Sequence, residues 1–369
     1  MPHDPYKALY LHIPYCVKKC AYCDFTSYEL RQNHKEIDEY VEQLVADIRK
    51  KSKCGELTEI ETVYIGGGTP SFIGQKRLSS LLYALGVSMN MECCECTMEA
   101  NPDSVAPELV RDVFALGVNR ISLGVQSFDD EVLQTLGRAH TSKQAVRTID
   151  ALQECFDNIS IDLMCGIPGQ SAKSFRESLE RAIEMNIPHV SIYPLTIERG
   201  TKFARLVRRG KMQAPDEDVQ AQYLEIAENL LESAGYARYE VASYAKPGYE
   251  CKHNIIYWSG VPYLGLGTSA ATMTQNAERR MRVKDGIVTD DIGVAEMMAE
   301  DFMLAMRMSA GVPAQRVQNA TNTLLPDVQK TFDELIELGL VKLEEGRYKP
   351  THTGWLCGNE MFERIFELA

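Results

Sequence analysis

The sequence has no long hydrophobic run and no excess of basic residues, and these two absences exclude several classes of protein. No stretch of its 369 residues approaches the roughly 20 apolar residues that a membrane-spanning helix needs. The first residues, Met1-Pro-His-Asp-Pro, lack the character of a signal peptide. The formal net charge of −13 argues against a general nucleic-acid binder, because phosphate contacts need clustered Lys and Arg. We therefore expect a cytoplasmic protein without stable membrane insertion and without a nucleic-acid partner.

Internal repeats and low-complexity linkers are also missing, and basic residues gather only in two short runs, 205–211 and 279–284. We interpret each run as a solvated face, not as an anion site. The eleven cysteines are an odd number on a chain without an export signal, which indicates free thiols in a reducing compartment and a metal site among them. Cys93, Cys94 and Cys96 lie close together, but they fall on a predicted strand and the turn before it, so we interpret them as buried or incidental thiols.

Cys16, Cys20 and Cys23 place three thiols in one short segment that offers no fourth. Thiolates are soft ligands that select iron–sulfur clusters, zinc or Cu(I). A [4Fe–4S] cube takes four protein sulfurs, so three would leave one iron with an open coordination site, where metal chemistry takes place.

The spacing alone leaves two alternatives to a cluster. Positions i, i+4 and i+7 also form a helical stripe that could simply be buried, although Pro14 and the lysines within the run disfavour a helix. A zinc site, with His12 or Asp24 as the fourth ligand, is the second alternative.

The run Tyr10-Leu-His-Ile-Pro-Tyr-Cys-Val-Lys-Lys-Cys-Ala-Tyr-Cys-Asp-Phe25 resembles the CX3CX2C signature of the radical S-adenosylmethionine (SAM) superfamily. The resemblance implies that the open iron is chelated by the amino and carboxylate groups of SAM. The residues around the cysteines are similar to one branch of that superfamily, the oxygen-independent coproporphyrinogen III oxidases and their HemW-type heme-chaperone relatives.

Strand and helix patterns alternate along residues 8–195, which predicts a parallel sheet with crossover helices. The predicted strands are 8–13, 62–65, 96–100, 120–124, 159–163 and 190–193. The predicted helices are 37–50, 77–87, 107–116, 145–155 and 174–185. Six units are fewer than the eight of a closed barrel. The resemblance implies the matching fold class, an α/β protein built on an open (β/α)6 partial TIM barrel with its cluster at the top of the first strand.

The pattern changes after residue 215, and we expect three domains or segments: a core over 1–235, a connecting α+β segment over 236–292 and a C-terminal module over 293–369. In the last of these, helices at 294–308, 313–319 and 327–338 precede a strand–turn–strand pattern at 340–349, which is typical of a winged-helix-like module. Winged helices often bind DNA, but this one has the acidic pair Glu344-Glu345, so we interpret it as a packing or protein-contact module.

Gly66, Gly67, Gly68 and Thr69 directly follow the second predicted strand. A phosphate loop is excluded, because no Gly-Lys-Ser/Thr follows at the required spacing. Taken alone, the run predicts a tight turn whose glycines let a ligand approach the backbone. The resemblance implies that it is the loop that binds the amino group of SAM.

Polar residues also occur at or near the ends of the later strands, where the ligand site of a parallel sheet is expected. They are Glu99, Gln126, Asp162 and, in a following loop, Arg138. Carboxylates and amides suit ribose hydroxyls, and an Arg fork suits a carboxylate. The resemblance implies that the first three contact the hydroxyls and polar groups of SAM, that Arg138 binds its carboxylate, and that Tyr10 and Tyr22 line the same site.

The run His253-Asn-Ile-Ile-Tyr-Trp258 combines a histidine with two aromatic residues. A histidine is a common heme ligand and aromatic rings can stack on a flat macrocycle, although chemistry alone also allows a buried turn with a satisfied histidine. The run is similar to an HNxxYW motif of the HemW-type heme chaperones, which implies heme binding at His253. Cys251 is a second candidate for the axial donor.

The resemblance therefore implies a protein with one [4Fe–4S] cluster and exchangeable SAM that binds heme and transfers it to an acceptor protein, with an electron donor for the cluster as a further partner. Whether SAM is cleaved does not follow from the residues. The alternative is an enzyme, an oxygen-independent coproporphyrinogen III oxidase. Those decarboxylases carry a further cysteine two residues past the third ligand, and the equivalent residue here is Phe25.

Overall fold

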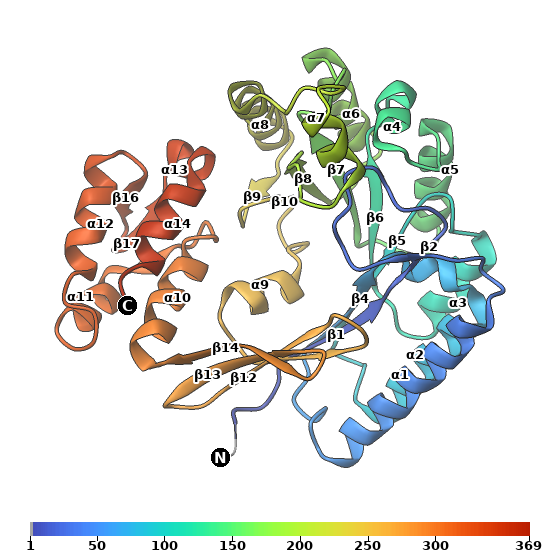
Figure 1. Ribbon diagram of the computed structural model, residues 1–369, viewed down its shortest axis with the longest axis horizontal. Coiled ribbons are helices and arrows are strands. Elements are labelled where there is room, and N and C mark those ends of the chain that lie inside the picture. Colours follow the sequence, from blue (N-terminus) through green and yellow to red (C-terminus); the bar gives the residue numbers. More distant parts are fainter. Residues whose placement is uncertain (1–2) are drawn as a thin grey trace.

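The computed structural model describes residues 3–369, and its central layer is a parallel sheet (Figure 1). Six strands lie side by side in sequence order and run in the same direction. They are β1 (Ala8–Ile13), β4 (Thr62–Gly67), β5 (Glu95–Ala100), β6 (Arg120–Gln126), β7 (Ile159–Cys165) and β8 (His189–Pro194). The predicted alternation of strands and helices is confirmed.

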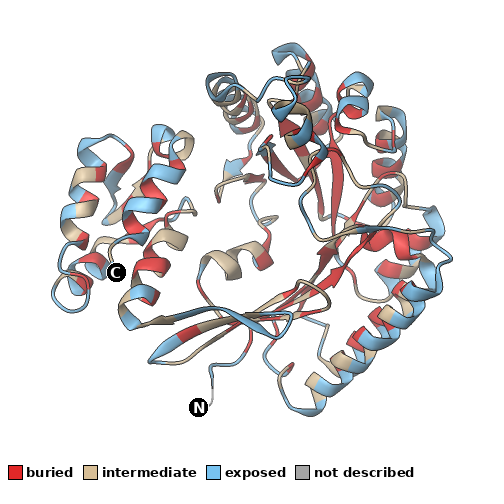
Figure 2. Cartoon of the chain, viewed as in Figure 1, coloured by how far each residue is buried: buried red, intermediate tan, exposed pale blue. Residues whose placement is uncertain are grey.

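Helices cover the outer face of this sheet, with their buried sides toward the strands and their exposed sides toward solvent (Figure 2). They are α1 (Lys35–Lys53), α2 (Gln75–Ser88), α3 (Pro107–Ala115), α4 (Asp130–Leu136), α5 (Ser142–Gln153), α6 (Ala172–Glu184) and α8 (Glu217–Ser233). Two shorter helices lie elsewhere: the 3-10 helix η1 (Pro70–Ile73) is entirely buried, and α7 (Lys202–Arg208) packs against Ala21. Because the strands are covered by helices on one side and by their own interior on the other, β1 and β6 are almost entirely buried.

Helix α1 illustrates how the sequence determines these elements. The His34 side chain caps its first turn by accepting from the backbone N–H of Glu36. Acidic residues in the first turn and lysines in the last complement the helix dipole. Its buried residues recur at helical spacing and pack on the sheet; they are Ile37, Val41, Leu44 and Ile48.

The sheet is open and extends past both edges of the six strands. Beyond β8 lie β10 (Ser243–Ala245) and β9 (Ala237–Arg238). Beyond β1 lie β11 (Tyr263–Leu266), which is parallel to β1, and then β12 (Ala271–Gln275), β13 (Arg279–Lys284) and β14 (Ile287–Gly293), which pair antiparallel. Residues 237–293 therefore extend the main sheet at both edges, together with helix α9 (Lys252–Trp258) on its inner side (Figure 1).

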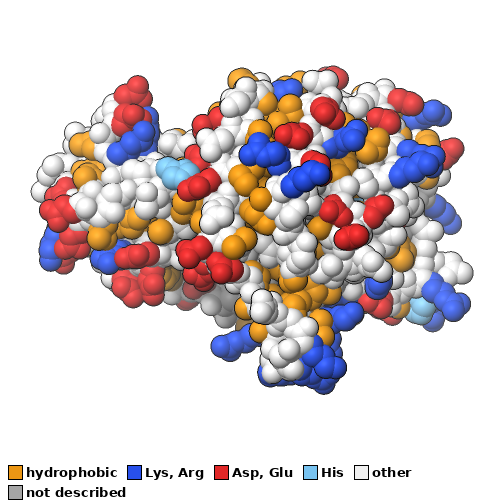
Figure 3. All heavy atoms as spheres, turned by 90° about the horizontal axis from the view of Figure 1, so that it is seen from above, with side chains coloured by type: hydrophobic (Ala, Val, Ile, Leu, Met, Phe, Trp, Pro, Cys, Tyr) orange, Lys and Arg blue, Asp and Glu red, His pale blue; other side chains and the backbone are white. Residues whose placement is uncertain are grey.

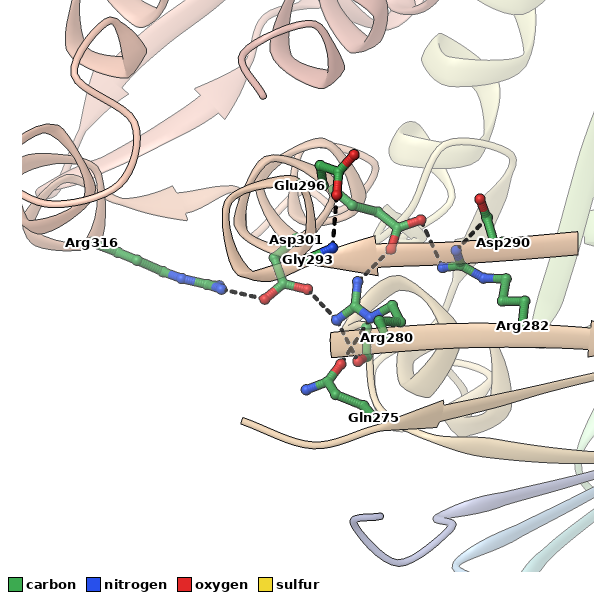
Figure 4. A network of polar contacts seen from close by, with 10 residues as sticks. Gln275, Arg280, Arg282, Asp290, Gly293, Glu296, Asp301 and Arg316 are labelled. Atoms are coloured by element: carbon green, nitrogen blue, oxygen red, sulfur yellow. Dashed lines mark hydrogen bonds and ion pairs between the residues drawn. The ribbon is translucent and has the colours of Figure 1, made fainter. Parts of the chain in front are cut away.

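The interpretation of the basic run 279–284 as a solvated face is wrong for Arg280, although Arg279 and Lys284 are exposed. Its side chain is 1% exposed and binds Glu300 and Asp301 of the following helix, the carbonyl of Gly260 and the side chain of Gln275 (Figure 4). Arg282 joins the same network through Glu300. The positive charges are thus used to hold β13 against the C-terminal module.

That module has its own hydrophobic core and begins with α10 (Val294–Ala305). It continues with β15 (Val312–Pro313), α11 (Ala314–Thr321), α12 (Val328–Glu337), β16 (Val341–Glu344) and β17 (Arg347–Pro350), whose three strands pair in the order β15-β17-β16. The predicted helices and hairpin are present. Two helices that the sequence pattern did not predict complete the chain, α13 (His352–Leu356) and α14 (Gly358–Phe366).

None of the helices formed by residues 3–369 is both long enough and apolar enough to cross a membrane. Seen from above, acidic, basic and hydrophobic side chains are interspersed over the visible surface, and the basic side chains do not form one continuous face on that side (Figure 3).

Candidate functional site

A cavity of about 390 Å³, which we call the main cavity, lies inside the curved sheet. Cys16, Cys20 and Cys23 line the end where the parallel strands finish. Arg120 and His189, the first residues of β6 and β8, line the opposite end, which we call the floor. The cavity therefore runs along the strands from their carboxyl ends, the usual ligand site of such sheets, toward their starts.

The three cysteines lie on a loop of residues 14–29 that folds back beside β1. Two short parallel strands, β2 (Tyr15–Cys16) and β3 (Tyr28–Glu29), close the loop. Its middle is fixed at Ala21, whose N–H donates to the carbonyl of Leu136 at 3.0 Å and whose carbonyl accepts from the N–H of Phe203 at 2.9 Å. The loop is not helical, so the alternative of a buried helical stripe is wrong.

Two of the thiols accept hydrogen bonds, one from the loop after β4 and one from the loop after α4. The Thr69 hydroxyl lies 3.4 Å from Sγ of Cys16, and Nη1 of Arg138 lies 3.4 Å from Sγ of Cys20. Burial raises the pKa of the Cys16 and Cys23 thiols, the latter to about 11. A bound cation reverses this preference, because metal coordination deprotonates a thiol. Donors that favour a thiolate therefore already face the loop.

The arrangement of ligands fits a cluster better than zinc. Within residues 3–369, no three His, Cys, Asp or Glu side chains surround a position suited to a single metal ion. His12 is also committed elsewhere, because its Nδ1 lies 3.0 Å from the Tyr10 hydroxyl and its Nε2 lies 3.0 Å from the Thr26 carbonyl. In a [4Fe–4S] cube each cysteine binds a different iron, so the three ligands need not surround one position.

The glycine loop brings its backbone close to the cysteine loop. A Cβ atom on Gly68 would stand 2.8 Å from the backbone N of Tyr15, and one on Gly67 would stand 2.6 Å from the His12 ring. Gly67 also has a φ of 115°, which other residues rarely adopt. These contacts explain the glycines, and they leave the following Thr69 lining the main cavity.

The carboxyl groups of Glu99 on β5 and Asp162 on β7 line the main cavity. Glu99 accepts hydrogen bonds from the Tyr64 hydroxyl and the Gly67 N–H, both at 3.0 Å, and burial raises its pKa. Burial, and then the nearby charge of Glu99, raise the pKa of Asp162 to about 7. The pair can therefore both accept and donate hydrogen bonds near neutral pH, as binding to ribose hydroxyls requires.

Gln126 reaches the main cavity through a local irregularity in the sheet. The register between β6 and β7 shifts between Leu123 and Gln126, and Gln126 has a φ of 67°. Such bulges redirect side chains and are common next to binding sites. The side chain of Gln126 is buried at the cavity wall as a result.

Asn101 is a residue that the sequence reasoning missed. Its Oδ1 accepts from Nη2 of Arg138 at 2.6 Å, and its Nδ2 donates to the Thr69 hydroxyl at 2.8 Å. Arg138 also donates to the carbonyl of Gly124 at 2.6 Å. Asn101 thus connects the two side chains that bind Cys16 and Cys20. It directly follows β5, and the rule that led to Glu99 and Gln126 could have found it.

The structure brings most of the predicted site residues into one cavity. The main cavity is lined by Cys16, Cys20, Tyr22, Cys23, Gly67, Gly68, Thr69, Glu99, Gln126, Arg138 and Asp162. Three predicted residues lie outside its lining. Gly66 lies beneath Glu99 and Tyr64, while Tyr10 and His253 line a neighbouring pocket.

That second pocket, which we call the aromatic pocket, has a volume of about 290 Å³. It is lined by Tyr10, Tyr64, His253, Asn254, Tyr257, Tyr263 and Ala271. Tyr64 and Asn254 also line the main cavity, so the two spaces share part of a wall. The ring of His253 lies between Tyr64 and Tyr257, at centroid distances of 5.1 and 4.9 Å.

His253 itself is 2% exposed and is held by one ring nitrogen. Its Nδ1 lies 2.8 Å from the hydroxyl of Thr62, while its buried Nε2 has no hydrogen-bond partner among the described residues. Burial, and then the charge of Arg120, lower the pKa of its imidazole to about 3. The ring is therefore neutral at physiological pH, with a free lone pair or N–H at Nε2.

Comparison with known proteins agrees with this geometry. Residues 10–182 match the family model of the radical SAM superfamily, and residues 294–357 match that of the HemN C-terminal domain. The chain is thus a radical SAM protein, a class whose members carry a [4Fe–4S] cluster and bind SAM, and its three cysteines lie within the matched region.

Two curated relatives extend the similarity over nearly the whole chain. The heme chaperone HemW of Bacillus subtilis is 34% identical over 380 residues, which cover 96% of this chain and 98% of the relative. The heme chaperone HemW of Escherichia coli is 34% identical over 374 residues, which cover 97% and 98%. The chain belongs to the HemW family of radical SAM proteins.

A solved structure supports the fold independently. The coproporphyrinogen III oxidase HemN of E. coli superposes with a TM-score of 0.81, covering 99% of this chain and 91% of that one, at 21% sequence identity. This likeness confirms the radical SAM fold expected from the sequence, with its C-terminal module.

Proposed function

We propose that the protein is a heme chaperone, which binds heme and passes it to an acceptor protein, with a [4Fe–4S] cluster and SAM as cofactors. The observation that carries the proposal is the similarity to proteins named heme chaperone HemW over 96–97% of the chain. The aromatic pocket beside the main cavity supports it, because it places a neutral histidine among flat rings.

For the cofactors, we assign the cluster to Cys16, Cys20 and Cys23 and the SAM site to the part of the main cavity lined by Thr69, Glu99, Gln126, Arg138 and Asp162. When bound, the cluster would supply an iron with an open coordination site and one-electron reducing power. Arg138 would orient the SAM carboxylate through its fork while Asn101 and Gly124 hold the guanidinium in place. Glu99 and Asp162, with their raised pKa values, would bind the hydroxyl groups.

For heme, we assign His253 as the axial ligand. Thr62 binds one ring nitrogen and leaves Nε2 without a partner, in the way that outer contacts orient metal-binding histidines. Cys251 is the weaker candidate, because burial raises the pKa of its thiol to about 12 and it lies against Glu95 at the start of α9. A thiol that stays protonated is a poor iron ligand.

Two structural features qualify this assignment. His253 is buried and its Nε2 has no contact with solvent, so side chains around the ring must move for iron to reach that nitrogen. Trp258 does not line the aromatic pocket: its indole N–H donates to Glu240 at 3.1 Å and Arg307 of the C-terminal module stacks on it. Tyr10, Tyr64 and Tyr263 provide the flat wall instead.

Reduction of the cluster needs an electron donor. We propose that the donor docks on the outer side of the cysteine loop. A groove there is lined by Cys20 and Cys23 together with five cationic side chains, Lys18, Lys19, Arg199, Lys202 and Arg205. Val17, Phe25 and Tyr28 are exposed on the same loop. An apolar patch with a basic rim suits a protein donor with an acidic face.

We place the protein in the cytoplasm, where cluster cysteines remain reduced. The test of the proposed function is a heme titration of the anaerobically reconstituted protein, followed by mixing with an apo-heme protein. Saturation near one heme per chain and spectral transfer to the acceptor are expected. Conversion of coproporphyrinogen III to protoporphyrinogen IX, with no heme uptake, would establish the decarboxylase alternative instead.

A further inference from the structure

Arg120 is a buried cation without a protein partner. Its side chain is 2% exposed at the floor of the main cavity, and its Nε has no hydrogen-bond partner. Across residues 3–369, none of the ion pairs includes this guanidinium. A buried guanidinium whose donors bind no other group is costly, so a ligand is the partner to expect.

Arg280 shows what a buried arginine looks like when its role is structural. It is 1% exposed, and carboxylates of Glu300 and Asp301 and the carbonyl of Gly260 satisfy its guanidinium. The two arginines are similarly buried, but among the described residues only Arg280 is bound directly by carboxylates.

The surroundings of Arg120 leave it directed at the main cavity. Burial opposes its charge, but nearby Cys251 and Glu95 raise its pKa above the ordinary value. The Glu95 carboxylate nevertheless accepts from the N–H groups of Lys252 and His253, at 3.1 Å each, and makes no hydrogen bond to Arg120. His189 is held by the Ser160 and Tyr239 hydroxyls at 2.7 and 2.9 Å, and burial keeps its pKa well below the ordinary value, so it is neutral. A mobile anion is therefore the partner that the floor still needs.

The chemistry of that anion follows from the charge around it. One guanidinium balances one negative charge, and Glu99 and Asp162 in the same cavity disfavour a dianion such as phosphate. A planar fork also matches a carboxylate in two parallel hydrogen bonds. The serine hydroxyls of Ser122 and Ser160 line the same end and can donate to it.

We propose that Arg120 binds an alkyl carboxylate that enters the main cavity. Two sources share this chemistry: a propionate side chain of heme, reaching past Tyr64 and Asn254 from the aromatic pocket, or a free small carboxylate. The first source rests on the proposed heme function, and the second does not. Arg120 is thus a binding residue at a subsite distinct from the one assigned to SAM.

The test compares heme with iron protoporphyrin IX dimethyl ester, which lacks free carboxylates, on the full-length protein and on Arg120→Gln. If Arg120 binds a heme propionate, Arg120→Gln should weaken heme binding about 10- to 100-fold, because a charge-assisted hydrogen-bond pair is lost. Binding of the ester should then change less than about 3-fold. For a free carboxylate, heme and ester bind both proteins equally, but sodium propionate or succinate raises the melting temperature of the wild type and not of the variant.

Two controls make the result decisive. Arg120→Met should lower the melting temperature of the ligand-free protein less than Arg280→Met does, since carboxylates bind only Arg280 directly. A fall for Arg120→Met as large as that for Arg280→Met would overturn the proposal, because it would show that Arg120 is neutralised by the protein. SAM affinity should not change in Arg120→Gln, and an equal loss there would assign the carboxylate to SAM and overturn the proposal.

Two further outcomes of these measurements also decide between the proposals. If neither heme binding nor the response to small carboxylates depends on Arg120, the subsite does not exist. If the wild type takes up no heme, the proposed heme function fails, and the small-carboxylate measurement still decides the subsite.

Discussion

The hydroxyl of Thr62 and Nδ1 of His253 lie 2.8 Å apart, although 191 positions separate the two residues in the sequence. This contact joins the first residue of β4 to α9 and sets the direction of the imidazole. Glu95, the first residue of β5, holds the same helix through the backbone N–H of His253. The first residues of two barrel strands therefore hold both the backbone and the ring of His253, and they leave its Nε2 without a partner.

Replacing Cys16, Cys20 or Cys23 by Ser should abolish uptake of the cluster, because each thiolate binds its own iron. The wild type should take up about four irons and four sulfides per chain on anaerobic reconstitution. Cys93→Ser is the matched control, since Cys93 is exposed and away from the main cavity. Stoichiometric zinc in place of iron would contradict the cluster assignment.

Arg138→Ala should weaken SAM binding by about 1.5–3 kcal/mol, the range for a hydrogen bond to a charged group. The measurement is the change that SAM causes in the electron paramagnetic resonance spectrum of the reduced cluster. Asn101→Ala should weaken binding less, because Asn101 positions Arg138 without touching SAM. An unchanged SAM titration in Arg138→Ala would exclude Arg138 from the site.

The buried imidazole of His253 should make stability depend on pH. Its pKa falls from 6.5 in the unfolded chain to about 3 in the folded protein. The unfolded chain therefore binds a proton first, so the contribution of the neutral ring is complete above about pH 6.5 and is lost as the pH falls toward 3, by up to about 1.4 kcal/mol per pH unit. His253→Gln should flatten the fall in unfolding free energy between pH 6 and pH 4, whereas the same change at exposed His3 should not.

Reversing charges beside the cysteine loop should slow reduction by a protein donor. Lys19→Glu combined with Lys202→Glu should lower the second-order rate with an acidic flavodoxin about 10-fold or more at low salt, because steering depends on charge. Reduction by dithionite should not change. Lys330→Glu, on α12 of the C-terminal module, is the control. Equal rates for all variants would place the donor elsewhere.

The sequence predicted the six parallel strands because each combines β-forming residues with burial on both faces, as in β1 and β6. It did not predict β12, β13 and β14 as strands, because residues 271–293 carry charged and polar side chains on both faces and show no apolar alternation. Their pairing is fixed by cross-strand ion pairs such as Arg282–Asp290 and by the contacts of Arg280 with α10, which no local pattern reveals.

The candidate site could likewise be predicted from the sequence only in part. Residues at strand ends could be expected to converge, and Glu99, Gln126 and Asp162 do line one cavity. The division of aromatic residues between two spaces could not be foreseen, because it depends on where α9 packs. Tyr10 and His253 consequently lie in the aromatic pocket, and Trp258 faces the C-terminal module.

Tyr64 and Asn254 line both the main cavity and the aromatic pocket, so they provide a direct route by which the two proposed ligands, SAM and heme, would affect each other's binding. If occupation of one space shifts either side chain, the affinity of the other space changes by some factor, and the same factor must hold in the reverse direction. Heme loading would then report on SAM, and SAM on heme, without any cleavage of SAM. A radical SAM fold can in this way serve as a two-ligand switch for cargo.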